Sequence, residues 1–174
     1  MSAIHYAQFE TQIHYTQIES PLGPLLLAAG DSGVHEIRFL NGRTPQKPES
    51  EWVRDDDDKP LCELAEQLDA YFSGKLEKFE LTLSPQGTSF QRSVWSRLCD
   101  IPYGETISYG EIARRIGNPQ ASRAVGLANG SNPIPIVIPC HRVVGSNGKL
   151  TGYGGGLPIK EKLLSLERRQ LTLL

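Results

Sequence analysis

Residues 108–130 read SYGEIARRIGNPQASRAVGLANG. Ser108 and Glu111 match a capping box, in which the serine hydroxyl accepts from the amide of Glu111 and the glutamate side chain reaches back to the amide of Ser108. Gly117 is expected to end this helix, and Asn118 and Pro119 then serve as the N-cap and the first residue of a second helix. Two short helices joined by a tight turn predict a helix-turn-helix.

The charge of the chain is divided between its halves. The formal net charge is −2, but residues 1–86 hold 7 basic and 15 acidic side chains, whereas residues 87–174 hold 11 and 5. A basic half beside an acidic one indicates a polyanionic partner for the basic half. The helix pair alone is equally typical of an αα corner that binds no nucleic acid, and the charge division favours the nucleic-acid interpretation without deciding it.

The first half of the chain has the pattern of a small sheet with one helix. Residues 12–19, 22–29 and 34–40 are rich in β-branched and apolar residues and are separated by turn residues, which predicts an antiparallel meander. Residues 41–58 end in four consecutive aspartates and are expected to form a solvated connector. A helix is predicted over 60–72, followed by one short strand over 79–83.

After residue 86 the pattern becomes mostly helical. Phe90, Val94 and Leu98 recur at helical spacing and predict a helix over 88–99, ahead of the helix pair. We therefore expect an α+β fold in two small domains. Residues 1–86 would form a small N-terminal antiparallel sheet with a helix, and residues 87–174 a mostly helical domain with the helix-turn-helix.

Several protein classes are disfavoured by the composition. The longest apolar run, residues 25–29, is far shorter than the ~20 residues that span a bilayer. Residues 1–10 lack the basic start and apolar core of a secretory signal. The three cysteines, Cys62, Cys99 and Cys140, form neither an even disulfide set nor a CxxC metal pair. We therefore expect free thiols in a reducing, cytoplasmic compartment.

The segment over residues 132–145, NPIPIVIPCHRVVG, is the expected place of the chemistry. Its three prolines restrict the backbone and fix the approach to Cys140. The reactive form of a cysteine is the thiolate, which basic or positive neighbours favour, and His141 and Arg142 follow Cys140 directly. The alternative, a cysteine that is only a small buried hydrophobe, fits poorly with these two companions.

His141 is the candidate base, although adjacent side chains on an extended segment point to opposite faces. It would therefore act on Cys140 through a water molecule or after a turn of the chain. A base also needs a group that orients it, and Glu161, in the first turn of a helix opened by Pro158, is the candidate. An acidic residue there is also favoured simply by the helix dipole, and spacing alone leaves both interpretations of Glu161 open.

The sequence IPIVIPCHRV at residues 134–143 strongly resembles the active-site motif of the O6-alkylguanine-DNA alkyltransferases, also called methylated-DNA–protein-cysteine methyltransferases. Four flanking stretches resemble landmarks of the same family in the same order. They are ISYGE at 107–111, ASRAVG at 121–126, NGSNP at 129–133 and GYGGGL at 152–157. The resemblance is close over roughly residues 88–168 and holds only in general layout before them.

The resemblance implies an activity and catalytic roles. Cys140 would attack the saturated carbon on O6 of an alkylguanine by in-line displacement, and O4-alkylthymine would be a second substrate. His141 would take the thiol proton through water, while Glu161 would orient His141 and stabilise its charged form. Tyr109 would donate a proton to the leaving guanine, and general acid assistance of this type typically contributes ~10²–10⁴-fold.

The resemblance also implies roles around the substrate. Asn132 would tie the helix-turn-helix to the active-site segment, and the backbone around Val143 and the side of Tyr153 would line the guanine pocket. Gly154 stands where some relatives have a serine near the guanine oxygen, and this difference leaves the corresponding hydrogen bond to backbone amides.

Double-stranded DNA containing alkylated guanine is the partner that the resemblance implies. The damaged nucleotide would be turned out of the stack, and Arg123 would fill the vacated space. Small residues dominate the second helix, which implies close backbone approach in the minor groove rather than base reading in the major groove. They are Ala121, Ser122, Ala124, Gly126 and Ala128. Several of them, with Val125, equally match a packing stripe.

The product would be a thioether with no route back, and we expect a single-use, monomeric acceptor without cofactor or metal. No Cys/His cluster in the first half has the spacing of a zinc site. Three rival functions remain. The first is a cysteine hydrolase built on Cys140, His141 and Glu161, which would leave the helix-turn-helix unexplained. The second is a lesion-binding module, which would lack the cysteine. The third is a transcription regulator, which would need side chains that read bases.

Overall fold

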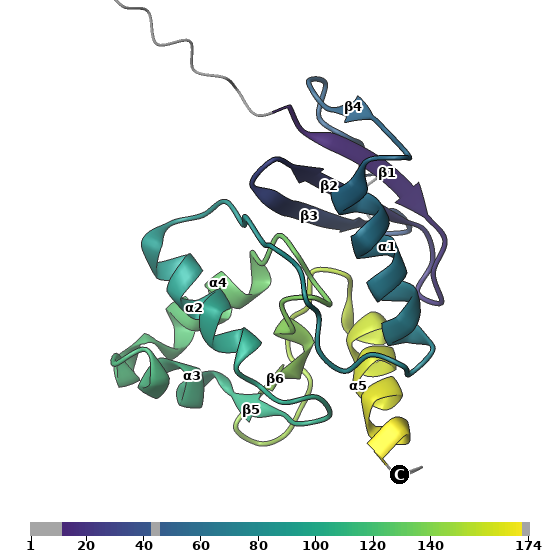
Figure 1. The fold of residues 1–174 in the computed structure, drawn as a ribbon. Coiled ribbons are helices and arrows are strands. Elements are labelled where there is room, and N and C mark those ends of the chain that lie inside the picture. The colour runs from purple at the N-terminus through teal and green to yellow at the C-terminus, as the bar shows by residue number, and fades with distance from the viewer. Residues whose placement is uncertain (1–11, 43–45, 172–174) are drawn as a thin grey trace, which may run out of the picture.

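The computed structural model describes residues 12–42 and 46–171, so the prediction for residues 1–10 lies outside the described ranges. The N-terminal half contains three strands in the antiparallel meander that the sequence predicts: β1 (His14–Ile18), β2 (Leu25–Gly30) and β3 (Gly33–Phe39). Every residue of β2 is buried, and this strand lies between β1 and β3 in the sheet (Figure 1).

A fourth strand corrects the prediction for residues 41–58. β4 (Val53–Arg54) lies in this expected connector and pairs parallel with β1, so that the sheet is mixed, with strand order β3-β2-β1-β4. It forms because the free edge of β1 offers carbonyl groups to the amides of Val53 and Asp55. The strand predicted over 79–83 is wrong, since this stretch makes only an isolated bridge between Leu83 and Val34.

Helix α1 (Lys59–Phe72) packs against the sheet and confirms the predicted helix (Figure 1). Its N-cap is Asp58, whose side chain accepts from the amide of Leu61. Its buried face consists of Leu61, Leu64, Leu68 and Tyr71. The apolar stripe thus ends at Tyr71 and not at Phe72, and the hydroxyl of Tyr71 reaches the candidate active site described below.

The C-terminal half contains the predicted helix-turn-helix. Helix α2 (Ser89–Cys99) precedes it, and α3 (Tyr109–Arg115) is joined to α4 (Ser122–Gly130) through the 3₁₀ turn η1 (Pro119–Ala121) (Figure 1). The three helices pack on one another. Among the described residues, no helix is both long and apolar enough to cross a membrane.

The helix caps follow the predictions only in part. Ser108 caps α3 by accepting from the amide of Glu111, but the Glu111 side chain pairs with two arginines of its own helix instead of the backbone of Ser108. Asn118 makes no side-chain cap, because the chain first turns through η1. A complete capping box is present at the start of α2 instead, formed by Thr88 and Gln91.

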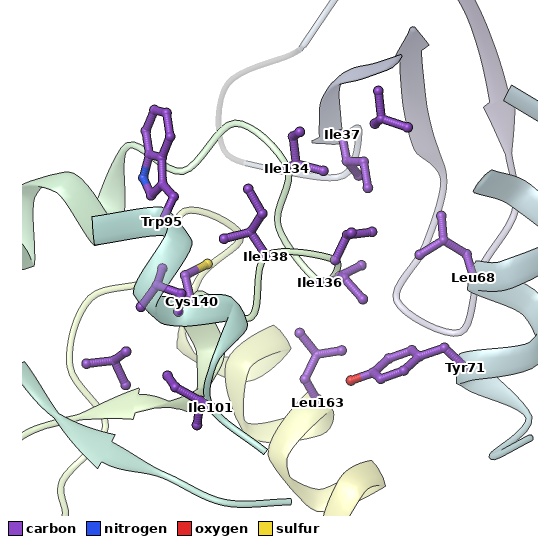
Figure 2. Packing of buried hydrophobic residues seen from close by; sticks show 14 of the residues in the cluster. Ile37, Leu68, Tyr71, Trp95, Ile101, Ile134, Ile136, Ile138, Cys140 and Leu163 are labelled. Carbon is purple, nitrogen blue, oxygen red and sulfur yellow. The ribbon is translucent and has the colours of Figure 1, made fainter. Parts of the chain in front are cut away.

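One cluster of buried hydrophobic side chains runs through both halves of the chain (Figure 2). It includes Ile37 of β3, Leu68 of α1, Ile136 of the segment before Cys140, and Leu163 of α5 (Leu157–Leu171). The amide of Ile37 also donates to the carbonyl of Pro133 (2.9 Å). The N-terminal sheet is therefore fixed against the segment that carries the cysteine.

Two short parallel strands connect this segment to the helix-turn-helix. β6 (Val143–Val144) directly follows the 3₁₀ turn η2 (Cys140–Arg142) and pairs with β5 (Ile107–Ser108). Since β5 leads straight into α3, a direct backbone connection joins the cysteine to the first helix of the pair.

Candidate active site

The segment before Cys140 is a compact loop that Asn132 holds together. The Asn132 Nδ2 donates to the carbonyl of Ile138 (2.8 Å), and its Oδ1 accepts from the amide of Ile134 (3.0 Å). The chain reverses at Ile136 with φ 76°, a left-handed conformation that is costly for a β-branched residue. Complete burial of the Ile136 side chain maintains this conformation. The backbone that leads to Cys140 is thus rigid.

Asn129 provides a contact between α4 and the cysteine that sequence patterns do not reveal. Its Nδ2 lies 3.4 Å from the carbonyl of Cys140, and its Oδ1 is buried without a hydrogen-bond partner among the described residues. Asn132, the predicted link, follows α4 and bonds within the loop, so the two asparagines together join the helix-turn-helix to the active-site segment.

Cys140 lies in the wall of a cavity of about 830 Å³. Asn129, Asn132, Tyr153 and Gly154 line the same cavity. Residues of the N-terminal sheet and the turn after it complete the wall; they are Ile37, Arg38, Phe39 and Asn41. The sequence assigns no role to these residues, because a contact between β3 and the C-terminal half is long-range and leaves no local pattern. The N-terminal half therefore shapes the site as well as supporting it.

The thiol of Cys140 is a weak acid in this environment. Burial raises the pKa of Cys140 to about 11, although Asn132, Lys160 and Tyr153 act in the opposite direction. The group is therefore protonated at neutral pH, and its use as a nucleophile requires an acceptor for the proton.

His141 is held by Glu167 and not by Glu161. The Nε2 of His141 lies 2.6 Å from Oε1 of Glu167, and both side chains are fully buried. The prediction for Glu161 is wrong because of the register of α5. The helix buries Lys160, Leu163, Leu164 and Glu167, which are spaced i, i+3, i+4 and i+7, whereas Glu161 is exposed. Reading this stripe in the sequence would have favoured Glu167.

Glu167 accepts hydrogen bonds from three other residues besides its contact with His141. Two come from the Arg142 guanidinium (3.0 Å to each oxygen), one from the hydroxyl of Tyr71 (2.7 Å) and one from the amide of Gly104 (3.0 Å). Burial alone would raise the pKa of Glu167, but the bonds from His141 and Arg142 lower it to about 2. The carboxylate is therefore ionised and acts only as an acceptor.

The state of His141 follows from this partner. Burial lowers the pKa of His141, with Glu167 acting in the opposite direction, and the imidazole is neutral at pH 7. Since a carboxylate only accepts, the proton of the neutral ring lies on Nε2. Nδ1 then carries a free lone pair, and it is buried without a hydrogen-bond partner among the described residues. The ring can therefore take up one proton at Nδ1.

Tyr153 and Gly154 lie in the wall of the cavity that contains Cys140, whereas Val143 does not. The ring of Tyr153 packs against Phe39 (centroids 6.1 Å apart), and its hydroxyl is buried without a hydrogen-bond partner among the described residues. Burial and the charge of Cys140 raise the pKa of Tyr153 well above its usual value. Val143 is fully buried outside the cavity wall, with its carbonyl bonded to Lys160.

Tyr109 is hydrogen-bonded to Thr151. Its hydroxyl accepts from Oγ1 of Thr151 (3.0 Å) and lies 3.4 Å from the carbonyl of the same residue. It does not line the cavity that contains Cys140.

Helix α4 has one buried and one exposed face. Val125 and Ala128 are buried, and the indole of Trp95 donates to the carbonyl of Ala128 (2.8 Å). Ser122, Ala121 and Gly126 are partly buried. Arg123, Ala124 and Leu127 are exposed, and no hydrogen bond or ion pair to another described residue holds the Arg123 guanidinium. The small residues thus pack against the protein on one side of the helix. On the other side they leave a surface with few bulky side chains.

Leu127 is an exposed apolar residue of α4 to which the sequence, with its pattern of small residues, assigns no role. It is 78% exposed and lies four positions after Arg123, on the same face of α4.

The described residues bring together one group able to hold a metal ion, made of His14, Asp55 and Asp58. It differs from the Cys/His cluster considered in the sequence, because β1 and the start of α1 meet only in the fold. His14 Nδ1 pairs with Asp58 (2.9 Å), and Asp58 also caps α1. These contacts account for the group as an ordinary hydrogen-bonded cluster.

Comparison with known proteins gives a consistent result. The family model of the 6-O-methylguanine DNA methyltransferase DNA-binding domain matches residues 89–169, and the model of its ribonuclease-like domain matches residues 13–85. The methylated-DNA–protein-cysteine methyltransferase of Methanosarcina barkeri is 57% identical over 159 residues, which are 91% of this chain and 99% of that protein.

Solved structures agree with these matches. The crystal structure of the Mycobacterium tuberculosis O6-methylguanine methyltransferase is 50% identical with a TM-score of 0.83, over 93% of this chain and 99% of that one. That of M. tuberculosis OGT in complex with DNA is 50% identical with a TM-score of 0.82, over 90% and 94%. The chain belongs to the 6-O-methylguanine DNA methyltransferase family.

Proposed function

We propose that this protein repairs DNA by transferring the alkyl group of O6-alkylguanine to the Sγ of its own Cys140. The observation that carries the proposal is the arrangement around the cavity. A rigid loop presents the thiol to a space large enough for a purine, and the adjacent histidine is neutral and oriented by a buried carboxylate. The family and its relatives named as methylated-DNA–protein-cysteine methyltransferases support the same activity.

The reaction is a single displacement. The Sγ–carbon bond of Cys140 forms while the bond between that carbon and guanine O6 breaks, and the bonding electrons leave with the guanine. The thiol proton passes through a water molecule to Nδ1 of His141, and Glu167 stabilises the imidazolium. The hydroxyl of Tyr109 gives up its hydrogen bond to Thr151, forms one to the base and then protonates the leaving guanine. The thioether is stable, so each molecule reacts once.

The exposed face of α4 is the proposed DNA surface. It enters the minor groove, with Arg123 in place of the extruded nucleotide and the small residues of the helix allowing close approach. Asn132, Tyr153 and Gly154 hold the base or shape its pocket, and the backbone near Val143 supports this pocket from outside the cavity wall. We include in this proposal O4-alkylthymine as a second substrate, a monomeric and cytoplasmic protein, and the division of the chain into domains 1–86 and 87–174.

The stoichiometry of repair tests the proposed function. Duplex DNA with a single O6-methylguanine per molecule is incubated in excess over the protein, and the remaining lesion is measured after nuclease digestion. We expect lesion loss to stop when one equivalent per protein has disappeared. Continued loss beyond one equivalent would support a turnover enzyme, and absence of any loss would leave only a binding module.

Arg123→Ala should slow repair in duplex DNA by roughly 10–100-fold, the effect of losing a few kcal/mol that offset base extrusion. Reaction with a free alkylated guanine base should keep its rate, since no stack has to be opened. Arg54→Ala, which removes an exposed positive charge on β4, is the matched control and should react like the parent. Equal losses on duplex and free base would reject the role of Arg123.

Leu127→Ala should weaken binding to duplex DNA by about fivefold, because a leucine on the docking face loses part of its transfer free energy of roughly 2 kcal/mol when it is truncated. Alanine is the best helix former, so α4 and its stability should be unaffected. Fluorescence anisotropy of labelled DNA measures the affinity. Val53→Ala, at an exposed apolar residue of β4, is the control. An affinity equal to that of the parent would remove Leu127 from the surface.

A further inference from the structure

Tyr71 of α1 is a residue of the N-terminal half that bonds directly to the pair formed by His141 and Glu167. Its hydroxyl donates to Oε1 of Glu167 (2.7 Å), and the same oxygen lies 2.6 Å from Nε2 of His141. Tyr71 and Glu167 are both fully buried. Figure 2 shows the ring of Tyr71 extending from α1, with its hydroxyl pointing toward Leu163 of α5. The candidate base and the N-terminal half therefore share one carboxylate oxygen.

The packing of α1 does not explain the hydroxyl of Tyr71. The ring fills the last position of the buried stripe of α1 and packs against Phe72, Phe79 and Tyr103. A phenylalanine would make the same contacts without placing in the core a polar group that needs a partner. The contribution of the hydroxyl is therefore its bond to Glu167.

The donors to Glu167 hold its carboxylate from several directions. The amide of Gly104 and Nε of Arg142 donate to Oε2 (3.0 Å each), whereas the second guanidinium nitrogen of Arg142 and the hydroxyl of Tyr71 donate to Oε1. Within the described part of the chain, the bond from Tyr71 is the one that comes from the N-terminal half. It fixes the oxygen on which the orientation of His141 depends.

Tyr71 remains a hydrogen-bond donor over the accessible range of pH. Burial and the charge of Glu167 raise the pKa of Tyr71, and the same two causes raise that of Tyr103 to about 12. Further titratable or charged groups face Tyr71, His141 and Glu167 from the elements packed around them. They are Arg142 of η2, Tyr103 after α2, Tyr153 of the loop before α5, and Lys160 of α5.

We propose that Tyr71 is a positioning residue for alkyl transfer, whose hydroxyl holds the Glu167 oxygen that orients His141. The N-terminal half would thus contribute to the base of the reaction and not only to the cavity wall. This inference rests on the proposed function, since the base has a role only if Cys140 gives up its proton to His141. Tyr71 does not line the cavity of Cys140 and acts through Glu167.

The pH dependence of single-turnover transfer in Tyr71→Phe tests this role. The substitution removes one oxygen atom and keeps the ring. Transfer from duplex O6-methylguanine DNA is measured with the protein in excess, at pH 7 and at about pH 9.5, and fluorescence anisotropy gives the affinity for the same DNA. Tyr15→Phe makes the same change at a partly buried position of β1 and is the matched control.

We expect the rate constant of the Phe variant at pH 7 to be roughly fivefold below that of the parent, a part of the ~10²–10⁴-fold that a positioned base contributes. The affinity for DNA should stay within about twofold, because Tyr71 lies outside the cavity wall. At about pH 9.5 hydroxide ionises part of the Cys140 thiol, whose pKa burial raises to about 11, without help from His141. The two rate constants should therefore converge there, and Tyr15→Phe should react like the parent at both values.

A deficit of equal size at both pH values would overturn the inference, because a merely structural change does not depend on the source of the base. A Phe variant that reacts like the parent at pH 7 would overturn it as well. If the Phe variant does not fold, Tyr71→Met, which also lacks the hydroxyl, provides the same comparison. A parent without transfer at either pH contradicts the proposed function and this role with it, whereas transfer by the parent beside an unaffected Phe variant contradicts only the role of Tyr71.

Discussion

Glu167→Gln is expected to destabilise the protein by about 3–5 kcal/mol and to slow alkyl transfer by at least tenfold. The carboxylate neutralises the buried guanidinium of Arg142 and accepts from His141, Tyr71 and the backbone. An amide leaves the cation uncompensated in a dry environment, which is among the costly changes known for proteins. Its NH₂ group also faces donors, so that at least one hydrogen bond is lost.

Chemical denaturation measures the stability, and single-turnover transfer from O6-methylguanine DNA measures the activity. Glu161→Gln is the matched control, because it makes the same change at an exposed position of α5. It should alter neither quantity. A greater loss of activity in the Glu161 variant than in the Glu167 variant would restore the original sequence prediction and contradict the assignment to Glu167.

The dependence of the free energy of unfolding on acidic pH should also reflect the Glu167 carboxylate. The pKa of Glu167 is about 2 in the folded protein, below the ~4.3 of an unfolded glutamate. A depressed carboxyl pKa stabilises the fold above the unfolded value, and this contribution, about 3 kcal/mol, is lost as the pH falls from about 4.3 to about 2. In Glu167→Gln this part of the pH dependence should be absent.

Cys140→Ser is expected to abolish transfer while binding to alkylated duplex DNA stays within about twofold of the parent. A serine hydroxyl is a far weaker nucleophile than a thiolate at any accessible pH, and the substitution is nearly isosteric. The cysteine makes no disulfide, so the substitution should leave the hydrogen bond from Asn132 to the carbonyl of Ile138 in the loop intact. Cys62→Ser and Cys99→Ser are the controls and should retain full transfer. Residual transfer by the Cys140 variant would place the acceptor elsewhere.

Local patterns predict those features that neighbouring residues alone determine. The spacing of Leu61, Leu64 and Leu68 predicts α1, and Ser108 predicts the start of α3. The motif around Cys140 predicts the nucleophile, because prolines and a histidine in sequence are also neighbours in space. The helix-turn-helix follows from the same kind of information.

Features that depend on distant contacts escape this reasoning. β4 forms because β1 offers a free edge, and the composition of residues 41–58 is that of a loop. Phe39 enters the cavity wall through the packing of the N-terminal sheet on the C-terminal half. Local patterns also did not identify Glu167 as the partner of His141, for a different reason. Its distance from His141 in sequence carries no signal, and only the register of α5 shows that it, and not Glu161, faces inward.

The mass of the protein after reaction tests the central claim most directly. The parent is incubated with duplex DNA that contains O6-methylguanine, and its intact mass and the masses of its peptides are then measured. We expect a gain of one methylene unit per molecule, located on the peptide that carries Cys140, and no gain in Cys140→Ser. An unchanged mass, or a methyl group on Cys62 or Cys99, would contradict the account.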